Sequence, residues 1–366
     1  MNFTHFMPTE IFFGRGCVRE KGERLKELGA HALIVTGKSS QKNGALADAC
    51  AALDKNGQDF TVFDRVVPNP TLACVREGIA LAKSAGADFI VAIGGGSPMD
   101  AAKAIAILMK EERTDEEVFA GGYGKDALPM AHLPTTAGTG SEVTQYSILT
   151  NDFTKTKTSI SSPALFPKFA FLDGSYTDGL PRAVTVNTAI DAFSHAVEGI
   201  LSEQSTPLSD ALATESIRRL YPLLRAAVEE KLGERERDGL LYASMLAGMT
   251  IAQSGTTLVH GMGYALTYFY GIDHGRANGL LLGETLRLCE KKNLPALRLI
   301  LDACGEESAD GIRSTLDFCL GAREKIPRDR LEAFALTAMG NKNRKKSRYT
   351  PTDGEVREIY LRSFGL

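Results

Sequence analysis

The sequence has few of the features that mark an extracellular, membrane-spanning or nucleic-acid-binding protein. Its 366 residues include no tryptophan and only six cysteines, which form no CxxC pair. Scattered thiols of this kind favour a reducing compartment such as the cytoplasm. No apolar run approaches the roughly 20 residues that span a bilayer, and the first residues show no signal-peptide pattern. The formal net charge of −3 gives no electrostatic reason to bind nucleic acid or a membrane surface. We therefore expect a soluble, cytoplasmic protein.

What the first half does contain is an alternation of two patterns. Up to about residue 180, short apolar runs alternate with amphipathic stretches rich in Ala and Leu. The apolar runs are 31–37, 60–66, 87–96 and 127–136, and the amphipathic stretches cover about 41–55, 71–86 and 99–111. This alternation predicts a mainly parallel sheet with helices on both faces.

The second half has a different texture. From about residue 184 the sequence is rich in Ala, Leu, Glu and Arg at helical spacing, with few β-branched runs, which predicts an all-helical part. The segment 173–183 contains glycine and proline and separates the two patterns. We therefore predict an α/β domain over residues 1–180 and a helical domain over 181–366, in keeping with a length typical of about two domains.

Four residues of the second half suggest a metal site. Asp191 and His195 are four apart in AIDAFSHAVEG, so on a helix they share one face. His260 lies in TTLVHGMGYAL and His274 in GIDHGRANG, where the pattern predicts the start of a helix. One carboxylate and three imidazoles suit a divalent first-row metal such as iron or zinc. Histidines that only complete the packing of a helix would give the same pattern, so the spacing alone leaves both interpretations open.

The segment GGGSPMDAAKA (94–104) directly follows a predicted strand and is typical of a phosphate-binding turn. Its glycines let the backbone approach a ligand closely. We expect Ser97 to cap the following helix, Pro98 to be its first residue and Asp100 to complete a capping box. The free N–H groups at the helix start would then face a pyrophosphate. An ordinary strand-to-helix turn would look similar, and the segment is not a GxGxxG fingerprint.

Two further loops strengthen the nucleotide hypothesis. HLPTTAGTGSEVTQYSIL (132–149) places several hydroxyls around two glycines after another predicted strand. Loops at the carboxyl ends of parallel strands form the ligand crevice of open α/β sheets. In VTGKSS (35–40), Gly37 stands where an acidic residue would hold the ribose diol of NAD. Its absence removes repulsion against a 2′-phosphate, and Lys38, Ser39 and Ser40 could bind one. A plain surface turn is the alternative for this third loop.

Together these segments resemble the iron-containing (group III) alcohol dehydrogenases. The resemblance runs from FMPTEIFFG (6–14) through GGGSPMDAAKA, PTTAGTGSEVT and DAFSHAVEG to LVHGMG and DHGRANG, in the family's order and spacing over nearly the whole chain. It implies a Rossmann-like α/β domain followed by an all-helical domain, with a metal in the cleft between them. It also implies a homodimeric, NAD(P)-dependent alcohol dehydrogenase or aldehyde reductase that acts on small primary alcohols or diols.

The resemblance also implies a set of site residues. Asp191, His195, His260 and His274 match the family's four metal ligands, for Fe(II) or alternatively zinc. No further catalytic residue is predicted. Many members carry Asp at the position of Gly37, so this chain resembles the NADP-using branch, with NAD as the alternative. The predicted cofactor-binding residues are Gly37, Ser39, Ser40, Asn69, Gly95, Gly96, Ser97, Asp100, Thr135, Thr136, Thr139, Thr144, Ser147, Leu149, Lys157 and Leu180.

Two places depart from the family: Tyr264, and KKSRYTPT (345–352), which is a displaced form of the family's Asn-Pro-Arg run before the final helix. Two other functions also stay open. Many members have a histidine four residues after the third metal ligand, where this chain has Tyr264, so the route of the proton is unassigned. A lyase of the dehydroquinate synthase type would need several basic side chains around an anionic substrate. The small and apolar residues near His260 (Leu258, Val259 and Met262) favour a less charged substrate. A metal- and nucleotide-binding protein that has lost catalysis is the other alternative.

Overall fold

The computed structural model describes residues 2–340 and 342–366, with the side chains of Ser39 and Lys342 outside the described part. The chain forms two compact units. The sheet unit comprises Met7–Leu180 and Gly233–Leu241, and the helical unit comprises Met1–Phe6, Pro181–Leu232 and Tyr242–Leu366. These units differ from the predicted domains 1–180 and 181–366 in the first six residues and in the segment 233–241. That the two parts are separate domains stays a prediction.

The sheet unit is built on six parallel strands in the order β1-β8-β5-β4-β2-β3. The strands are β1 Glu10–Phe13, β2 His31–Thr36, β3 Asp59–Phe63, β4 Phe89–Gly94, β5 Met130–Pro134 and β8 Phe169–Leu172. A separate antiparallel hairpin pairs β6 Tyr146–Asn151 with β7 Thr156–Ser161. The four strands expected from the apolar runs are present, whereas β1, β8 and the hairpin were not predicted. The edge strand β1 has only four residues, two of them exposed, so it carries no clear apolar signal.

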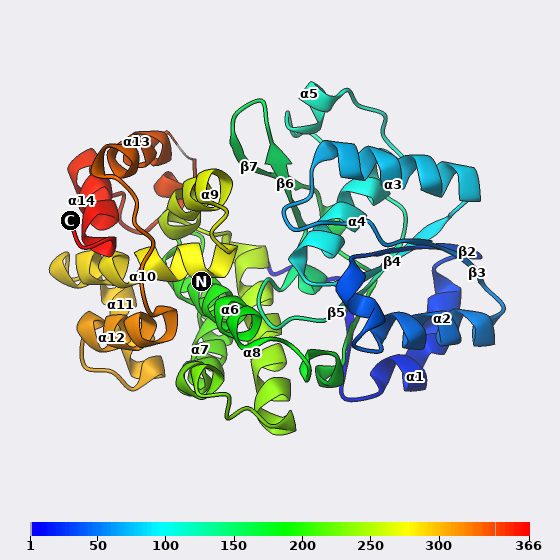
Figure 1. The fold of residues 1–366 in the computed structure, drawn as a ribbon, viewed down its shortest axis with the longest axis horizontal. Coiled ribbons are helices and arrows are strands. Elements are labelled where there is room, and N and C mark those ends of the chain that lie inside the picture. Colours follow the sequence, from blue (N-terminus) through cyan, green and yellow to red (C-terminus); the bar gives the residue numbers. More distant parts are fainter. Residues whose placement is uncertain (1, 341) are drawn as a thin grey trace. The chain divides into compact units, whose positions relative to one another are not determined.

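Helices cover both faces of the sheet, as the alternation predicts. Figure 1 shows α3 Leu72–Ala85 and α4 Gly96–Leu108 on one side of β2, β3 and β4, and α1 Cys17–Lys21 and α2 Ala45–Asn56 on the other. The short helices of this unit are α5 Asp115–Val118, η1 Gly22–Glu27, η2 Lys38–Gln41, η3 Ser141–Val143, η4 Pro163–Leu165 and η5 Gly174–Thr177.

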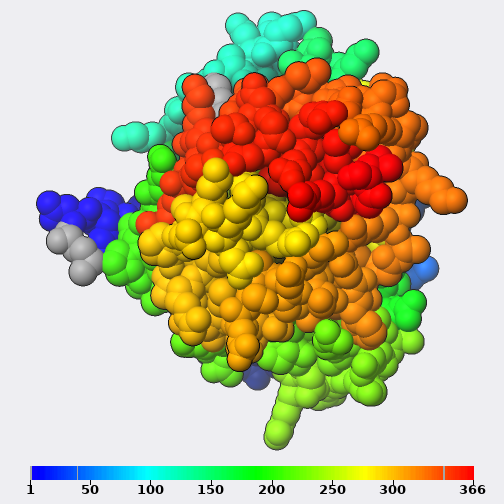
Figure 2. Space-filling view, turned by 90° about the vertical axis from the view of Figure 1, so that its left-hand side faces the viewer, coloured from blue at the N-terminus to red at the C-terminus, as the bar shows by residue number. Residues whose placement is uncertain are grey.

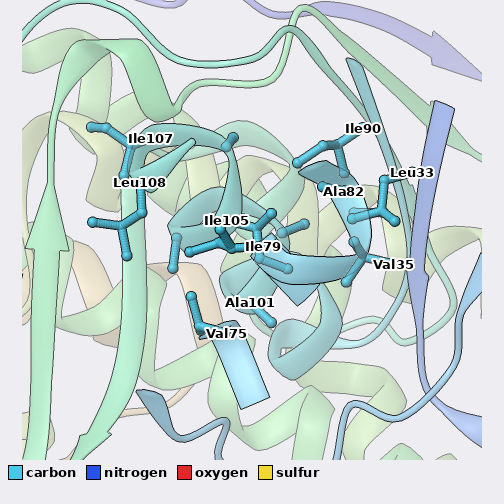
Figure 3. Packing of buried hydrophobic residues seen from close by; sticks show 14 of the residues in the cluster. Leu33, Val35, Val75, Ile79, Ala82, Ile90, Ala101, Ile105, Ile107 and Leu108 are labelled. Atoms are coloured by element: carbon cyan, nitrogen blue, oxygen red, sulfur yellow. The ribbon is translucent and has the colours of Figure 1, made fainter. Parts of the chain in front are cut away.

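Alternate residues of the central strands pack into two different cores. Leu33 and Val35 face the core that contains Ile79 of α3 and Ile105 of α4 (Figure 3). Ala32, Ile34 and their neighbours face the second core, under α1 and α2. Because both faces are covered, the strands read as continuous apolar runs rather than as alternating ones.

The helical unit contains α6 Arg182–Leu201, α7 Pro207–Val228, most of α8 Glu234–Ser254, α9 Leu258–Tyr270, α10 His274–Lys291, α11 Pro295–Cys304, α12 Ala309–Leu320, α13 Arg328–Met339, η6 Lys342–Lys346 and α14 Asp353–Ser363. Helix α6 packs against α7, α10 and α11, and from Ala189 to Leu201 every one of its residues is buried. Figure 2 shows one face of this unit, where red C-terminal residues lie beside the yellow residues around α10. The prediction of a two-part protein, α/β and then helical, is confirmed. Among the described residues, no helix is long and apolar enough to cross a membrane.

Phe171 provides a test of the second core. It is fully buried in β8 and stacks on Phe12, with ring centroids 4.9 Å apart. We expect Phe171→Ala to lower the free energy of unfolding by about 3–5 kcal/mol, because it removes a large buried ring and leaves a cavity. Phe153, 61% exposed beyond the end of β6, is the matched control, and Phe153→Ala should change stability by less than about 0.5 kcal/mol. Chemical denaturation followed by circular dichroism measures both, and equal losses would contradict this account of the core.

Candidate active site

The strand order of the sheet reverses between β2 and β4, next to the loops from which the sequence predicts nucleotide binding. Strand β2 continues to β3 on one side and β4 continues to β5 on the other, so the carboxyl ends of β2 and β4 flank a switch point. Ligands bind at such points in open α/β sheets. The two strand ends are tied together, because Thr36 at the end of β2 donates from Oγ1 to the carbonyl of Ile93 at 2.8 Å.

The loop after β4 approaches the loop after β5. Thr135 donates its N–H to the carbonyl of Gly94 at 2.9 Å. A Cβ atom at Gly95 would lie 3.1 Å from Oγ1 of Thr136, and one at Gly96 would lie 2.7 Å from Cγ2 of Thr139. A larger residue at Gly96 would therefore displace the side chain of Thr139 where the two loops meet. The structure thus brings together the glycines and threonines that the sequence singled out.

The start of α4 differs from its prediction. The helix begins at Gly96 with Gly95 as its N-cap, so Ser97 and Pro98 lie inside the first turn and the expected capping box is wrong. Gly94 has φ of +145°, which lets the backbone turn into the helix earlier than a serine cap would. Gly95 offers no side chain to cap this helix start, so the first N–H groups of α4 have no capping acceptor and suit an anionic ligand.

The polar side chains around this turn bond to neighbouring loops instead. Ser97 accepts the N–H of Asn69 at 3.1 Å, and Asp100 accepts the hydroxyl of Ser141 at 2.9 Å. Ser147 donates to the carbonyl of Asp100 at 2.7 Å, which joins β6 to α4. These contacts gather segments far apart in the sequence around the start of α4.

Other predicted cofactor residues have different surroundings. Ser40 is fully buried, and its hydroxyl donates to the carbonyl of Gly37 at 2.8 Å, so it is already used within the turn. Leu149 is fully buried in the core under α4. Burial raises the pKa of Asp100 to about 6, and the charge of Lys157 in β7 is among the groups that oppose this rise. Leu180 follows η5 and donates its N–H to Thr177 at 3.1 Å. The side chain of Ser39 lies outside the described residues.

A buried lysine, which the sequence analysis did not single out, holds the loop after β5. Lys103 Nζ donates to the carbonyl of Ser141 at 2.6 Å and to that of Tyr146 at 2.9 Å. It also contacts the hydroxyls of Ser141 and Thr144 at 2.9 and 3.2 Å. Burial lowers the pKa of Lys103, while the nearby Asp100 and Glu142 act to raise it. A lysine in the middle of an Ala-rich helix was the available signal, because such a charge is rarely buried unless it is paired.

The candidate metal site lies within the helical unit. Asp191 and His195 project from one face of α6, His260 lies in the first turn of α9, and His274 is the first residue of α10. Ligand atoms of Asp191, His195 and His260 all lie within 4.8 Å of one another, and all three residues are buried. His274 lies beside them, with Nε2 3.9 Å from Oδ1 of Asp191. One carboxylate oxygen and a set of imidazole nitrogens in one cluster fit a divalent first-row metal.

Close helix packing creates this cluster. A Cβ atom at Gly275 would lie 1.9 Å from the carbonyl oxygen of Asn187 and 2.9 Å from Cβ of Asp191. Only glycine therefore allows the start of α10, and with it His274, to lie against α6. The rings of His195 and His260 stack with centroids 4.6 Å apart, and Tyr264 stacks on His274 at 5.6 Å. Tyr264, the position that departs from the family, thus faces a predicted ligand ring.

Two further polar residues surround the ligands and were also missed by the sequence analysis. Asn278 is fully buried, and its Nδ2 lies 3.0 Å from Oδ1 of Asp191, 3.2 Å from Nε2 of His260 and 3.3 Å from Nε2 of His274. Glu198 is fully buried and contacts Nδ1 of His260 through Oε2. Burial alone would raise the pKa of Glu198, but His260 and Thr257 hold it below its ordinary value. Their sequence signal was spacing, three residues after His195 and four after His274.

The apolar neighbours of His260 do not indicate the polarity of the substrate, contrary to the interpretation from the sequence. Leu258, Val259 and Met262 are almost wholly buried in the packing of α9. Their size and polarity therefore reflect the core of the helical unit rather than a surface that a substrate would meet.

The fold and the two clusters define a class: a two-part protein with a nucleotide-type α/β sheet and a histidine–carboxylate centre in a helical part. Comparison with known proteins agrees with this class. The model of the family "iron-containing alcohol dehydrogenase" matches residues 8–174, and that of its C-terminal region matches residues 185–364. The chain belongs to the iron-containing alcohol dehydrogenase family, and it is an oxidoreductase of the alcohol dehydrogenase type.

Curated relatives and solved structures support the assignment over most of the chain. The chain is 36% identical to lactaldehyde reductase of Escherichia coli K12 over 282 residues, which cover 75% of this chain and 73% of that protein. It is 37% identical to 1,3-propanediol dehydrogenase of Citrobacter freundii over 320 residues, covering 86% and 82%. An iron-containing alcohol dehydrogenase from Thermotoga maritima superposes with a TM-score of 0.93 at 38% identity, with both chains fully covered. Sulfoacetaldehyde reductase from Bifidobacterium kashiwanohense, solved with NAD+, gives 0.89 at 28% identity, covering 100% and 99%.

Glu142 makes the stability of the sheet unit depend on pH. It is 1% exposed, and burial raises its pKa to about 7 from an ordinary value of 4.5. Below pH 4.5 the carboxyl is neutral in both the folded and the unfolded chain. Between pH 4.5 and 7 it ionises only when the chain unfolds, so stability falls as pH rises through this window and is constant above it. The buried Lys103 nearby favours the ionised form.

We expect Glu142→Gln to remove this dependence. The variant should match the wild type at pH 4 and gain up to about 3 kcal/mol of relative stability by pH 7.5. Thermal unfolding at a series of pH values measures the difference, with the exposed Glu116→Gln as a matched control that should stay flat. If the difference in unfolding free energy between Glu142→Gln and wild type is the same at pH 4 and at pH 7.5, the pKa of Glu142 is not raised in the folded protein.

Proposed function

We propose that this protein interconverts a small primary alcohol or diol and the corresponding aldehyde, using a divalent metal and NADP. The observation that carries the proposal is the clustering of Asp191, His195 and His260, with His274 beside them, in a chain whose other unit has the strand order of a nucleotide-binding sheet. Lactaldehyde and 1,3-propanediol are the substrates named for two relatives at 36% and 37% identity, and they support this substrate class. The relative solved with NAD+ supports a nicotinamide cofactor.

In this proposal the four predicted ligands would hold Fe(II), with zinc as the alternative. A divalent cation in such a site acts as a Lewis acid on an alcohol or carbonyl oxygen. The protein contributes the fixed positions of its ligands. Asn278 donates to Asp191, and Glu198 contacts the far side of the His260 ring, so neither ligand is free to turn away.

The sheet unit would bind the cofactor, whose nicotinamide exchanges hydride with the substrate carbon. The uncapped N–H groups at the start of α4 suit its pyrophosphate, and the hydroxyls of Thr136 and Thr139 lie next to them. Lys103 holds the loop that carries these threonines. The loop is therefore ordered before the cofactor binds, and no binding energy is spent on ordering it. The proposed protein is also cytoplasmic and homodimeric. Its six free cysteines suit a reducing compartment, and the family resemblance supports the homodimer.

Asp191→Ala tests the metal and the activity together. We expect the variant to lose both metal retention and turnover of short alcohols or aldehydes, because it removes the only carboxylate in the clustered ligand set. Elemental analysis of anaerobically prepared protein measures the metal, and the near-UV absorbance of NADPH measures turnover. Asp329→Ala, at an exposed aspartate of α13, should leave both unchanged. Full activity in Asp191→Ala, or no turnover by wild-type protein reloaded with iron or zinc, would contradict the proposal.

Gly37→Asp tests the cofactor. A carboxylate at this position would repel the 2′-phosphate of NADP and accept hydrogen bonds from the ribose of NAD. We expect the ratio of kcat/KM for NADP to that for NAD to fall by about tenfold, a change of about 1.4 kcal/mol. Because any Cβ here would lie 3.0 Å from the carbonyl of Val66, Gly37→Ala is the control for crowding and should leave the ratio unchanged. The same ratio in Gly37→Asp and Gly37→Ala would show that this turn does not select the cofactor.

A further inference from the structure

Glu198 is the most heavily hydrogen-bonded carboxylate beside the candidate metal ligands. It lies on α6, seven residues after Asp191 and three after His195, so it shares their face of the helix. It is fully buried. A carboxylate in such a place is stable only when its oxygens are hydrogen-bonded.

One oxygen of Glu198 caps the helix that carries His260. Its Oε1 accepts the N–H groups of Thr257 at 2.9 Å and of Val259 at 3.0 Å, and the hydroxyl of Thr257 at 2.7 Å. The N–H of His260 lies 3.4 Å away. Thr257 itself makes no side-chain cap for α9. The free donors at the start of α9 are therefore satisfied from α6, and a negative charge is favourable at that end of a helix.

The other oxygen contacts Nδ1 of the His260 ring. An ionised carboxylate can only accept, so Nδ1 must carry the hydrogen. In a neutral imidazole the lone pair is then left on Nε2, the nitrogen that lies 3.8 Å from Oδ1 of Asp191.

Asn278 supports the same tautomer independently. Its Nδ2 lies 3.0 Å from Oδ1 of Asp191, a carboxylate oxygen that accepts, which identifies this end of the amide as the donor. The same nitrogen lies 3.2 Å from Nε2 of His260. The amide has two N–H groups: Asp191 accepts one, and the other is shared between Nε2 of His260 and Nε2 of His274, which is 3.3 Å away. A donor placed there fits an Nε2 of His260 that carries a lone pair and would clash electrostatically with an Nε2–H.

We propose that Glu198 is the positioning residue of the metal centre: it fixes His260 with hydrogen on Nδ1 and caps α9, so that Nε2 is directed at the other ligands before any cation binds. The inference rests on the proposed function for its purpose, because a lone pair on Nε2 is what a metal ligand needs. The tautomer of His260 and its contact with Glu198 are properties of the metal-free protein, so they can be tested without a metal.

Glu198→Gln is the most informative variant because it keeps the shape of the side chain and replaces one carboxylate oxygen, an acceptor, with an N–H donor. The amide oxygen can still accept from Thr257 and Val259, while the amide nitrogen presents N–H groups to Nδ1 of His260. We expect His260 to switch to the Nε2–H tautomer. Two-bond ¹H–¹⁵N spectra of ring-labelled, metal-free protein distinguish the two tautomers, with the His260 signals assigned from a His260→Gln variant.

We further expect the dissociation constant for Zn²⁺, measured against a competing chelator, to rise about 10- to 100-fold in Glu198→Gln. Two controls separate positioning from stability. Glu203→Gln, at an exposed glutamate just after α6, should change neither the tautomer nor zinc affinity. Thr257→Val removes one donor to Oε1 and should lower the unfolding temperature while His260 keeps hydrogen on Nδ1.

The wild-type spectrum decides the proposal even if Glu198→Gln does not fold. Hydrogen on Nε2 of His260 in wild-type protein would overturn it, and so would unchanged tautomer and zinc affinity in a folded Glu198→Gln. The expected tautomer and zinc results in a protein that turns over no alcohol would leave the role of Glu198 standing and refute the proposed function. Turnover of alcohols by a wild-type protein whose His260 carries hydrogen on Nε2 would support the proposed function and refute the role of Glu198.

Discussion

Both clusters depend on one constraint: a charged group buried in a protein is stable only when hydrogen bonds from the protein surround it. In the sheet unit, the ammonium of Lys103 is buried beside the loop after β5 and bonds to Ser141, Thr144 and Tyr146. In the helical unit, the carboxylate of Glu198 is buried behind His260 and bonds to the start of α9. A buried charge without such partners would cost far more free energy than an exposed one. The burial of two charges therefore fixes the shape of two loops.

Glycine has a complementary role in each unit. Gly96 lets the loop after β4 meet Thr139, and Gly275 lets α10 lie against the backbone of α6. Close backbone contact and buried charge together make the ligand-facing atoms stay in place, as a pre-organised site requires.

Much of this arrangement was predictable from the sequence, because its signals are local. The apolar runs of β2, β3, β4 and β5 are continuous since both faces of the sheet are covered. The spacing of Asp191 and His195 follows from the period of a helix. What was missed has a weak local signal: β1 is short and half exposed at the edge, and the β6–β7 hairpin lies in a segment rich in hydroxyl residues. The helix start at Gly96 was misplaced because the backbone freedom of Gly94 outweighed the capping preference of Ser97.

The sequence by itself determined the class of fold and the family, and it predicted the residues of the metal cluster, since periodicity and motif order need no knowledge of distant contacts. Only the tertiary structure showed that some predicted cofactor residues, such as Ser40 and Leu149, are buried in the protein's own packing. It also showed that Lys103, Glu198 and Asn278, which the sequence did not indicate, hold the candidate site residues in place. The physical reason is that a hydrogen bond between groups 38 to 87 positions apart depends on how the chain packs, and no local pattern records that distance.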